Sequence, residues 1–347
     1  MINLQVSRED AEKAARIVEE AENWKDLEKR VIESGLQPAK QYIEEYLFFA
    51  HLFMAGCYAA VNPRPGKRSG TATIVEKEGC DYHIHGIAHL RNRKKRMQEA
   101  FGSMENLVSE TGMAHKYRLK HAISQPRGDE CKYVPLKDYF LGLASSIYGG
   151  TIEPLMLLFQ GGHAKDALGK EGNERLIINV DGTKVRLGDA YLPERLEHSV
   201  MQEYATAGSF SRFTFIRSLS QAEFIEKVAK GNSLKEVHGL YGLIHEPMVA
   251  YFLRHPEKAA ELRQGLGNKK ARRGLYYGLS ASPWAAFTGV GVDAAEKCIG
   301  LAGGIYHAPL PFEITCLAVL LFSAYKSSEQ IAKAGTEWKL RRKKLKA

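Results

Sequence analysis

The chain has 347 residues, a length typical of two domains or of one large one. Hydrophobic residues make up 44% of the sequence and charged residues 26%, close to the globular average, which excludes a fibrous, collagen-like or disordered chain. The net charge of +9 is unevenly distributed, because residues 90–127 hold nine basic and three acidic residues and residues 339–347 hold six basic and no acidic ones.

The first part of the chain is predicted to be helical. Residues 7–35 begin with a capping-box-like Ser7 and place their apolar side chains on one helical face. Residues 38–56 are apolar nearly all round, which indicates a helix buried in the core. A turn-rich loop with three cations follows at residues 62–70, and we expect it to contact phosphate groups.

Two β-hairpins are predicted. Residues 71–87 resemble two short strands joined by a turn at residues 76–79. Residues 174–187 give the stronger signal, because Asp181-Gly182 fits a tight type I′ turn between two runs rich in β-branched residues.

Helical patterns fill most of the remaining chain. Helices are expected at residues 93–111, 114–123, 135–148, 152–168, 221–230, 233–254, 256–265, 293–302 and 311–343. The predicted fold class is α+β and predominantly helical. A mixed domain with two β-hairpins and a basic surface spans residues 1–193, and a C-terminal helical bundle with a basic tail spans residues 194–347.

Three histidines follow one another in and after the second predicted strand. Alternation along a strand puts His83 and His85 on the same side of the sheet, where two imidazoles can share a metal ion. His89 completes a His-x-His-x-x-x-His pattern, but no carboxylate or Cys cluster follows at a recognisable spacing. The histidines therefore fit either surface or phosphate-contacting positions, or a metal site.

Basic residues concentrate in a few segments. Five cations in residues 91–96 repel one another unless an anionic surface, such as a nucleic-acid backbone, faces them. Residues 210–217 interleave phenylalanines with arginines, a mixture that stacks bases and grips phosphates, or that forms an ordinary core segment. The candidate nucleic-acid-binding residues are Arg64, Lys67, Arg68, Arg91, Arg93, Lys94, Lys95, Arg96, Lys116, Arg118, Lys120, Arg212, Arg217, Lys269, Lys270, Arg272 and Arg273.

No motif in the sequence declares a reaction, and we expect no cofactor. The longest apolar stretch, residues 314–325, is shorter than the roughly 20 residues of a membrane span. The five cysteines are far apart and form no Cys-x-x-Cys, which is typical of a reducing compartment. We therefore expect a cytoplasmic protein that does not contact a membrane.

The basic, hairpin-containing N-terminal part, the helical part from about Tyr204 onwards and the basic tail together resemble the large subunit of an archaeal-type CRISPR surveillance complex (Cascade), of the I-A-like subtype. The resemblance implies a subunit that binds the protospacer-adjacent duplex and the displaced strand of target DNA. It also implies contact with subunits that carry guide RNA, and recruitment of a separate helicase–nuclease. The partners would then be DNA, guide RNA or both, and the other subunits of a ribonucleoprotein.

The leading hypothesis is therefore a non-enzymatic nucleic-acid-binding subunit that acts in antiviral defence. One alternative is a metal-dependent enzyme that uses His83, His85 and His89. Another is a scaffold whose basic surfaces meet acidic protein partners.

Overall fold

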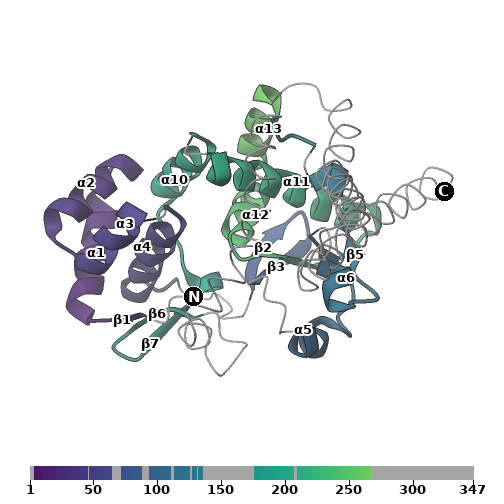
Figure 1. The fold of residues 1–347 in the computed structure, drawn as a ribbon, viewed down its shortest axis with the longest axis horizontal. Coiled ribbons are helices and arrows are strands. Elements are labelled where there is room, and N and C mark those ends of the chain that lie inside the picture. Colours follow the sequence, from purple (N-terminus) through teal and green to yellow (C-terminus); the bar gives the residue numbers. More distant parts are fainter. Residues whose placement is uncertain are drawn as a thin grey trace, which may run out of the picture. The chain divides into compact units, whose positions relative to one another are not determined.

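A computed structural model of the chain describes residues 4–45, 47–64, 72–87, 94–110, 113–125, 127–130, 132–135, 176–206 and 209–266 (Figure 1). The chain divides into two units, one made of residues 1–125 and 133–267 and the other of residues 126–132 and 268–347. The described part of the second unit contains the short helix α7 (Arg127–Glu130).

The N-terminal part is helical, as predicted. Its helices are α1 (Arg8–Glu20), α2 (Trp24–Ser34), α3 (Gln37–Glu45) and α4 (Leu47–Val61). The side chain of Ser7 accepts a hydrogen bond from Asp10 N and starts α1, and Asn23 starts α2 in the same way, so the single helix predicted for residues 7–35 is two helices. Most residues of α4 are buried, as predicted for a core helix, but the helix expected at residues 38–56 corresponds to two helices, α3 and α4.

A three-stranded sheet packs against α4. It contains β1 (Leu4–Val6), β6 (Leu176–Val180) and β7 (Thr183–Arg186), and a 3-10 turn at Leu187–Asp189 follows β7. The predicted hairpin between β6 and β7 is confirmed. Asp181 and Gly182 have φ angles of 45° and 91°, the left-handed conformations that a type I′ turn requires. The Asp181 carboxylate also accepts a hydrogen bond from Arg8 N at the start of α1.

A five-stranded sheet forms the second structural centre of this unit. Its strand order is β2 (Thr73–Lys77), β3 (Cys80–Ile87), β8 (Glu236–Gly242), β4 (Leu107–Ser109) and β5 (Ile123–Ser124). The predicted hairpin of β2 and β3 is confirmed and is antiparallel, whereas β3, β8, β4 and β5 run parallel to one another.

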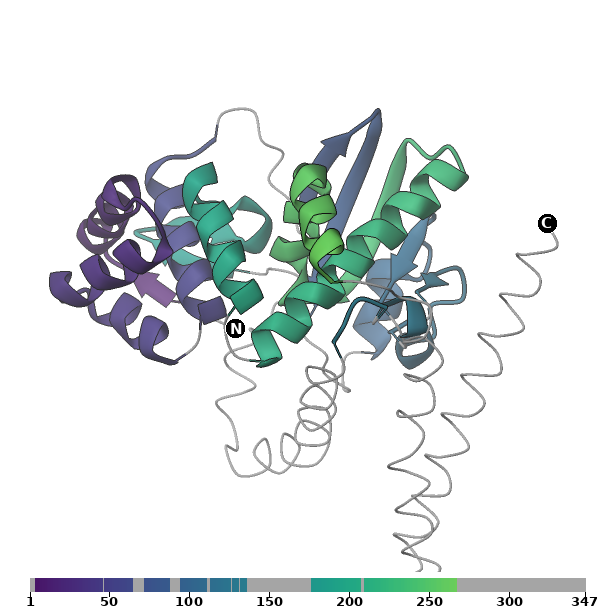
Figure 2. The same cartoon turned by 90° about the horizontal axis from the view of Figure 1, so that it is seen from above.

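Helices cover both faces of this sheet. The helices α11 (Ser209–Gly231) and α12 (His245–Arg254) lie on one face, and the long helix α11 runs alongside the strands in Figure 2. The other face packs against α5 (Lys94–Phe101) and α6 (Met113–Tyr117) through a hydrophobic cluster that includes Leu240 of β8. The helices α10 (Glu194–Thr206) and α13 (Pro256–Gly265) complete the unit.

Two predicted helices contain strands in the structure, and a third, expected at residues 114–123, ends at Tyr117 before β5 begins at Ile123. The helix expected at residues 93–111 ends at Phe101, and Leu107–Ser109 forms β4. The helix expected at residues 233–254 begins only at His245, because Glu236–Gly242 is the central strand β8. Both strands take their hydrogen bonds from segments distant in sequence, which local periodicity does not report.

The described chain is a predominantly helical mixture of helices and small sheets, as the sequence predicts. The first unit continues across residue 193 and includes α10 to α13 together with β8. The helices predicted at residues 293–302 and 311–343, and hence the C-terminal bundle and tail, lie outside the described residues. So do those at residues 152–168 and almost all of 135–148. No helix in the described ranges has both the length and the apolar character needed to cross a membrane.

Candidate functional site

Two histidines and a glutamate converge on the α5 side of the five-stranded sheet. His83 of β3 and His238 of β8 are paired across neighbouring strands, and their ring centroids are 4.8 Å apart. Glu236 stands two residues before His238, so its side chain points to the same face. The Nε2 atoms of His83 and His238 lie 3.1 Å and 3.2 Å from the same oxygen, Oε1 of Glu236.

His85 extends this group along β3. Its Nε2 atom lies 3.2 Å from Nδ1 of His238, and its ring meets the ring of Phe101, the last residue of α5, edge-on at 5.1 Å. His85 is buried, so its contact with Nδ1 of His238 holds the His238 ring in one orientation from the interior side. We call His83, His85, Glu236 and His238 the histidine cluster.

The histidine cluster opens towards solvent on one side. The side chains of His83 and His238 are each 17% exposed, and that of Glu236 is 55% exposed. Burial lowers the pKa of His238, and the neighbouring His83 lowers it further, although Glu236 acts in the opposite direction. The His238 imidazole is therefore neutral at neutral pH, the form in which histidine binds metals.

The sequence anticipated this cluster only in part. His83 and His85 share a face of the sheet, as predicted, whereas His89 lies outside the described residues. The partners that complete the group, Glu236 and His238, come from a segment that was expected to be helical. The alternation Glu-Val-His at residues 236–238 is the signal that would have found them, had the segment been recognised as a strand.

A second group of possible metal ligands lies where α10 meets the junction of α12 and α13. It consists of Glu194, His198 and His255. His198 contacts the Tyr251 hydroxyl through Nδ1 at 3.0 Å, and His255 lies 3.9 Å from Glu197, a carboxylate that also binds Arg254 at 2.9 Å. Because other side chains already engage these histidines, this group is the weaker candidate.

Several predicted basic residues lie on α5, on α6 and in the turn that follows α6. These two helices pack together on the sheet through Met97, Phe101, Met113 and Tyr117. Lys95 on α5 is exposed, as are Arg118 and Lys120 directly after α6, and the partly buried Lys116 lies 5.3 Å from the Tyr117 ring. Cations from two separate stretches of sequence thus share one supporting core. We call Lys95, Lys116, Arg118 and Lys120 the basic surface.

The other described cations lie elsewhere. The guanidinium of Arg64 stacks over the ring of Tyr191 at 3.8 Å. Residues 210–217 belong to α11, where Phe213 and Phe215 are buried, so this segment is part of the core. Arg212 is half-buried on the same helix.

Arg217, a predicted phosphate contact, forms an ion pair with a buried carboxylate. Its Nη2 atom lies 2.6 Å from Oε1 of Glu110, and both side chains are largely buried. An arginine that neutralises a buried carboxylate does not remain available for phosphate. The ion pair therefore holds the Arg217 side chain in the protein interior, next to Glu110 at the end of β4.

The remaining predicted contacts lie partly or wholly outside the described residues. Lys94 and Arg96 belong to α5, but their side chains lie outside the description. Outside the described residues altogether are Lys67, Arg68, Arg91, Arg93, Lys269, Lys270, Arg272 and Arg273.

The carboxyl ends of the parallel strands hold a different polar group. Oε2 of Glu110, which follows β4, accepts a hydrogen bond from Gly242 N at 2.8 Å, and Oε2 of Glu246 in α12 accepts one from Gly86 N at 2.6 Å. Both carboxylates are buried. In open α/β sheets this edge is the usual ligand site, and its N–H groups bind phosphates or other anions. Here the chain's own carboxylates occupy those donors.

A serine–histidine contact near this edge is structural. Ser218 Oγ lies 2.8 Å from Nδ1 of His245, and it donates to Thr214 O one turn earlier in α11. Ser218 is fully buried within the helix, so a substrate has no access to its hydroxyl group. The arrangement therefore gives no support to hydrolysis by a serine nucleophile.

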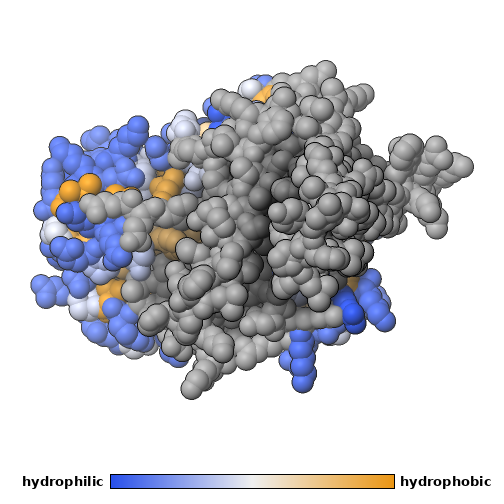
Figure 3. All heavy atoms as spheres, viewed as in Figure 1, coloured by the Kyte–Doolittle hydropathy of each residue, from blue (hydrophilic) through white to orange (hydrophobic). Residues whose placement is uncertain are grey.

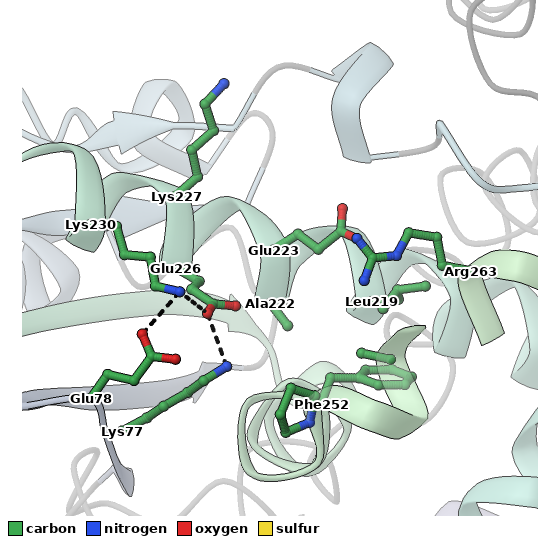
Figure 4. Close-up of a pocket in the computed structure, with 12 residues that line it drawn as sticks. Lys77, Glu78, Leu219, Ala222, Glu223, Glu226, Lys227, Lys230, Phe252 and Arg263 are labelled. Carbon is green, nitrogen blue, oxygen red and sulfur yellow. Dashed lines mark ion pairs between the residues drawn. The ribbon is translucent and has the colours of Figure 1, made fainter. Parts of the chain in front are cut away.

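A hollow of about 510 Å³ lies between α11, α12, α13 and the turn after β2 (Figure 4). Lys77 and Lys230 both bind Glu226 at 2.9 Å, and Lys230 also binds Glu78 at 3.0 Å. Lys227 points away from the hollow. Because carboxylates pair with the lysines inside it, the hollow offers little net charge to an anionic ligand.

The comparisons with known proteins add no relative to this picture. No protein-family model matches the sequence, and neither the curated proteins nor the solved structures gave a match.

Proposed function

We propose that the chain is a non-enzymatic nucleic-acid-binding subunit of a CRISPR interference ribonucleoprotein, and that the basic surface contacts the phosphate backbone. One observation carries the proposal. Lys95 on α5 and the pair Arg118 and Lys120, which follow α6 and flank Leu119, are exposed and more than 20 residues apart in sequence, and α5, α6 and Leu119 contribute to one hydrophobic cluster. A shared hydrophobic base holds these segments in place relative to one another, which suits contacts to the regularly spaced phosphates of a nucleic-acid backbone.

The character of the remaining surface supports a polar partner. The described side chains visible in Figure 3 are mainly hydrophilic. Among the described residues, Ile32 is the only large hydrophobic side chain that is exposed, at 46%. Stable protein–protein interfaces usually bury an apolar centre, so this part of the surface favours a charged backbone over a scaffold role.

The resemblance drawn from the sequence gives the proposal its finer content. The ligand would be target DNA, as the protospacer-adjacent duplex and the displaced strand. A separate helicase–nuclease would perform the cleavage, in antiviral defence. The basic surface would position the duplex without reading its sequence, because contacts to phosphate carry no sequence information directly.

Charge reversal on the basic surface tests the proposal. Duplex binding is measured by fluorescence anisotropy over a range of salt concentrations, for the native chain and for the double variant Arg118→Glu, Lys120→Glu. Each lost phosphate contact reduces the slope of log K against log salt by about 0.9, so the double variant should lose about 1.8.

The matched control is Lys25→Glu, Lys29→Glu on α2, which changes the net charge equally at two other exposed positions. It should retain most of the affinity and the slope. Equal loss of affinity and slope in both double variants would show that only the net charge matters. An unchanged slope in Arg118→Glu, Lys120→Glu would overturn the proposal.

A further inference from the structure

We propose that His83 Nε2, His238 Nε2 and a carboxylate oxygen of Glu236 bind one divalent transition-metal ion, a site that is independent of the proposed nucleic-acid contact. The three donors come from two parallel strands, β3 and β8, that neighbour each other in the sheet. Bound there, the ion would join segments of the chain that are some 150 residues apart in sequence.

Two of the three spacings between donor atoms are close to those around a tetrahedral ion, and all three donors lie within 4.8 Å of one another. Bonds of about 2.0–2.1 Å place the ligand atoms of a tetrahedral zinc ion about 3.3 Å apart. The two Nε2 atoms lie 3.1 Å and 3.2 Å from Oε1 of Glu236, close to that edge length. An ion at the centre therefore replaces two hydrogen-bond protons with little movement of the side chains.

His85 prepares His238 for this role. A metal at Nε2 requires that the remaining proton of the His238 ring sits on Nδ1 and finds an acceptor there. Nε2 of His85, at 3.2 Å, is in position to accept it. Histidine ligands commonly have such a partner on the second ring nitrogen, which fixes both the tautomer and the orientation of the ring. His85 is thus a positioning residue.

The surrounding charge favours a cation. In the sheet register, Asp81 lies beside Glu236 on one side and beside Glu76 on the other, so three carboxylates face the same way. Within the described part of the chain, neither Asp81 nor Glu76 forms an ion pair with a basic side chain. Like charges on adjacent strands repel, and a bound divalent ion would relieve that repulsion.

The donor set selects the class of ion. Two imidazoles and one carboxylate suit zinc, cobalt or nickel, whereas magnesium and calcium prefer sites built from oxygen alone. Three protein donors leave the fourth position to water or to an external ligand. Glu236 is 55% exposed, so the ion can enter from solvent.

The test uses the full chain, stripped with a chelator and incubated with zinc alone, then with cobalt alone. We expect one zinc per chain by elemental analysis, and visible cobalt absorption that shifts when azide is added. Glu236→Gln and His238→Ala should lose stoichiometric zinc, and His85→Phe should weaken affinity about 10- to 100-fold, as for partners of ligating histidines. Because Glu236 is exposed, its variant keeps the test valid if His238→Ala misfolds.

His198→Ala, in the second group of possible ligands, is the matched control and should retain one zinc per chain. Absence of zinc from the native chain would overturn the site. So would full retention in Glu236→Gln, or loss in His198→Ala with retention in His238→Ala. Duplex binding by these variants is measured in parallel, so that failure of the metal site and failure of the nucleic-acid proposal are told apart.

Discussion

The two ends of the five-stranded sheet treat their polar side chains in opposite ways. At the carboxyl ends of the strands, Glu110 is buried and is neutralised by Arg217, and its second oxygen is held by a backbone N–H group. Towards the amino end of β8, Glu236 is largely exposed, and its oxygen faces two imidazoles. At the carboxyl ends, the Glu110 carboxylate therefore has its partners within the protein, and these contacts stabilise the fold. The second end keeps a set of donors within reach of solvent, which is why we place the metal site there.

The largest expected effect comes from breaking the internal ion pair. Arg217→Met leaves Glu110 as a buried charge without its cation and should cost about 3–5 kcal/mol of unfolding free energy. Glu236→Gln at the other end should change stability by less than about 0.5 kcal/mol in metal-free protein. Urea unfolding followed by circular dichroism measures both, and equal losses would contradict the contrast between the two ends.

A smaller effect is expected from crowding the carboxyl end. A Cβ atom on Gly86 would lie 2.3 Å from Oε2 of Glu246 and 3.1 Å from the Cα atom of Leu243, so Gly86→Ala should cost up to about 3 kcal/mol. Gly231→Ala in α11 is the control, because its Cβ would meet no atom within 4 Å. The melting temperatures of the two variants are compared. If Gly86→Ala melts no lower than Gly231→Ala, the Glu246 side chain moves aside freely.

The smallest expected effect is a loss of stability at acidic pH caused by His51, which is more fully buried than His238. Burial lowers the pKa of His51 to about 4, whereas the unfolded chain takes up this proton near pH 6.5. Stability is therefore complete above about pH 6.5 and falls as the pH drops towards 4, by about 2 kcal/mol between pH 7 and pH 5. His51→Gln should remove that part of the pH dependence, and urea midpoints at both pH values measure it. An identical slope in the variant would mean that another group titrates.

The sequence revealed local structure better than it revealed pairings. The turns at Glu78-Gly79 and Asp181-Gly182 carry their own conformational signal, so both hairpins were predictable. The strand β8 was not, because its hydrogen bonds come from segments more than 120 residues earlier and only four residues separate it from the end of α11 at Gly231. The same limit hid half of the histidine cluster. His83 was recognisable from its alternation with His85, but its partner His238 could be assigned only once the register was known.

Buried charge was equally hard to foresee. Arg217 lies among phenylalanines in a basic segment, a pattern shared by phosphate-binding surfaces and by helices that bury an arginine against a distant carboxylate. Only the position of Glu110 at the end of β4 separates the two cases. The basic surface was anticipated in composition, and the folding of α5 against α6 supplied its shape.

The order of the strands has a consequence for synthesis on the ribosome. The middle strand of the five-stranded sheet is made last, some 130 residues after its neighbour β4. At translation rates of about 5–20 residues per second, β3 and β4 wait on the order of ten seconds before the strand that joins them emerges. Throughout that interval the nascent chain presents open strand edges, the surfaces through which incomplete chains associate. We therefore expect fragments that end before residue 236 to aggregate. The pairing of β8 with β3 and β4 closes these strand edges and so ends the period in which the chain associates with other copies of itself.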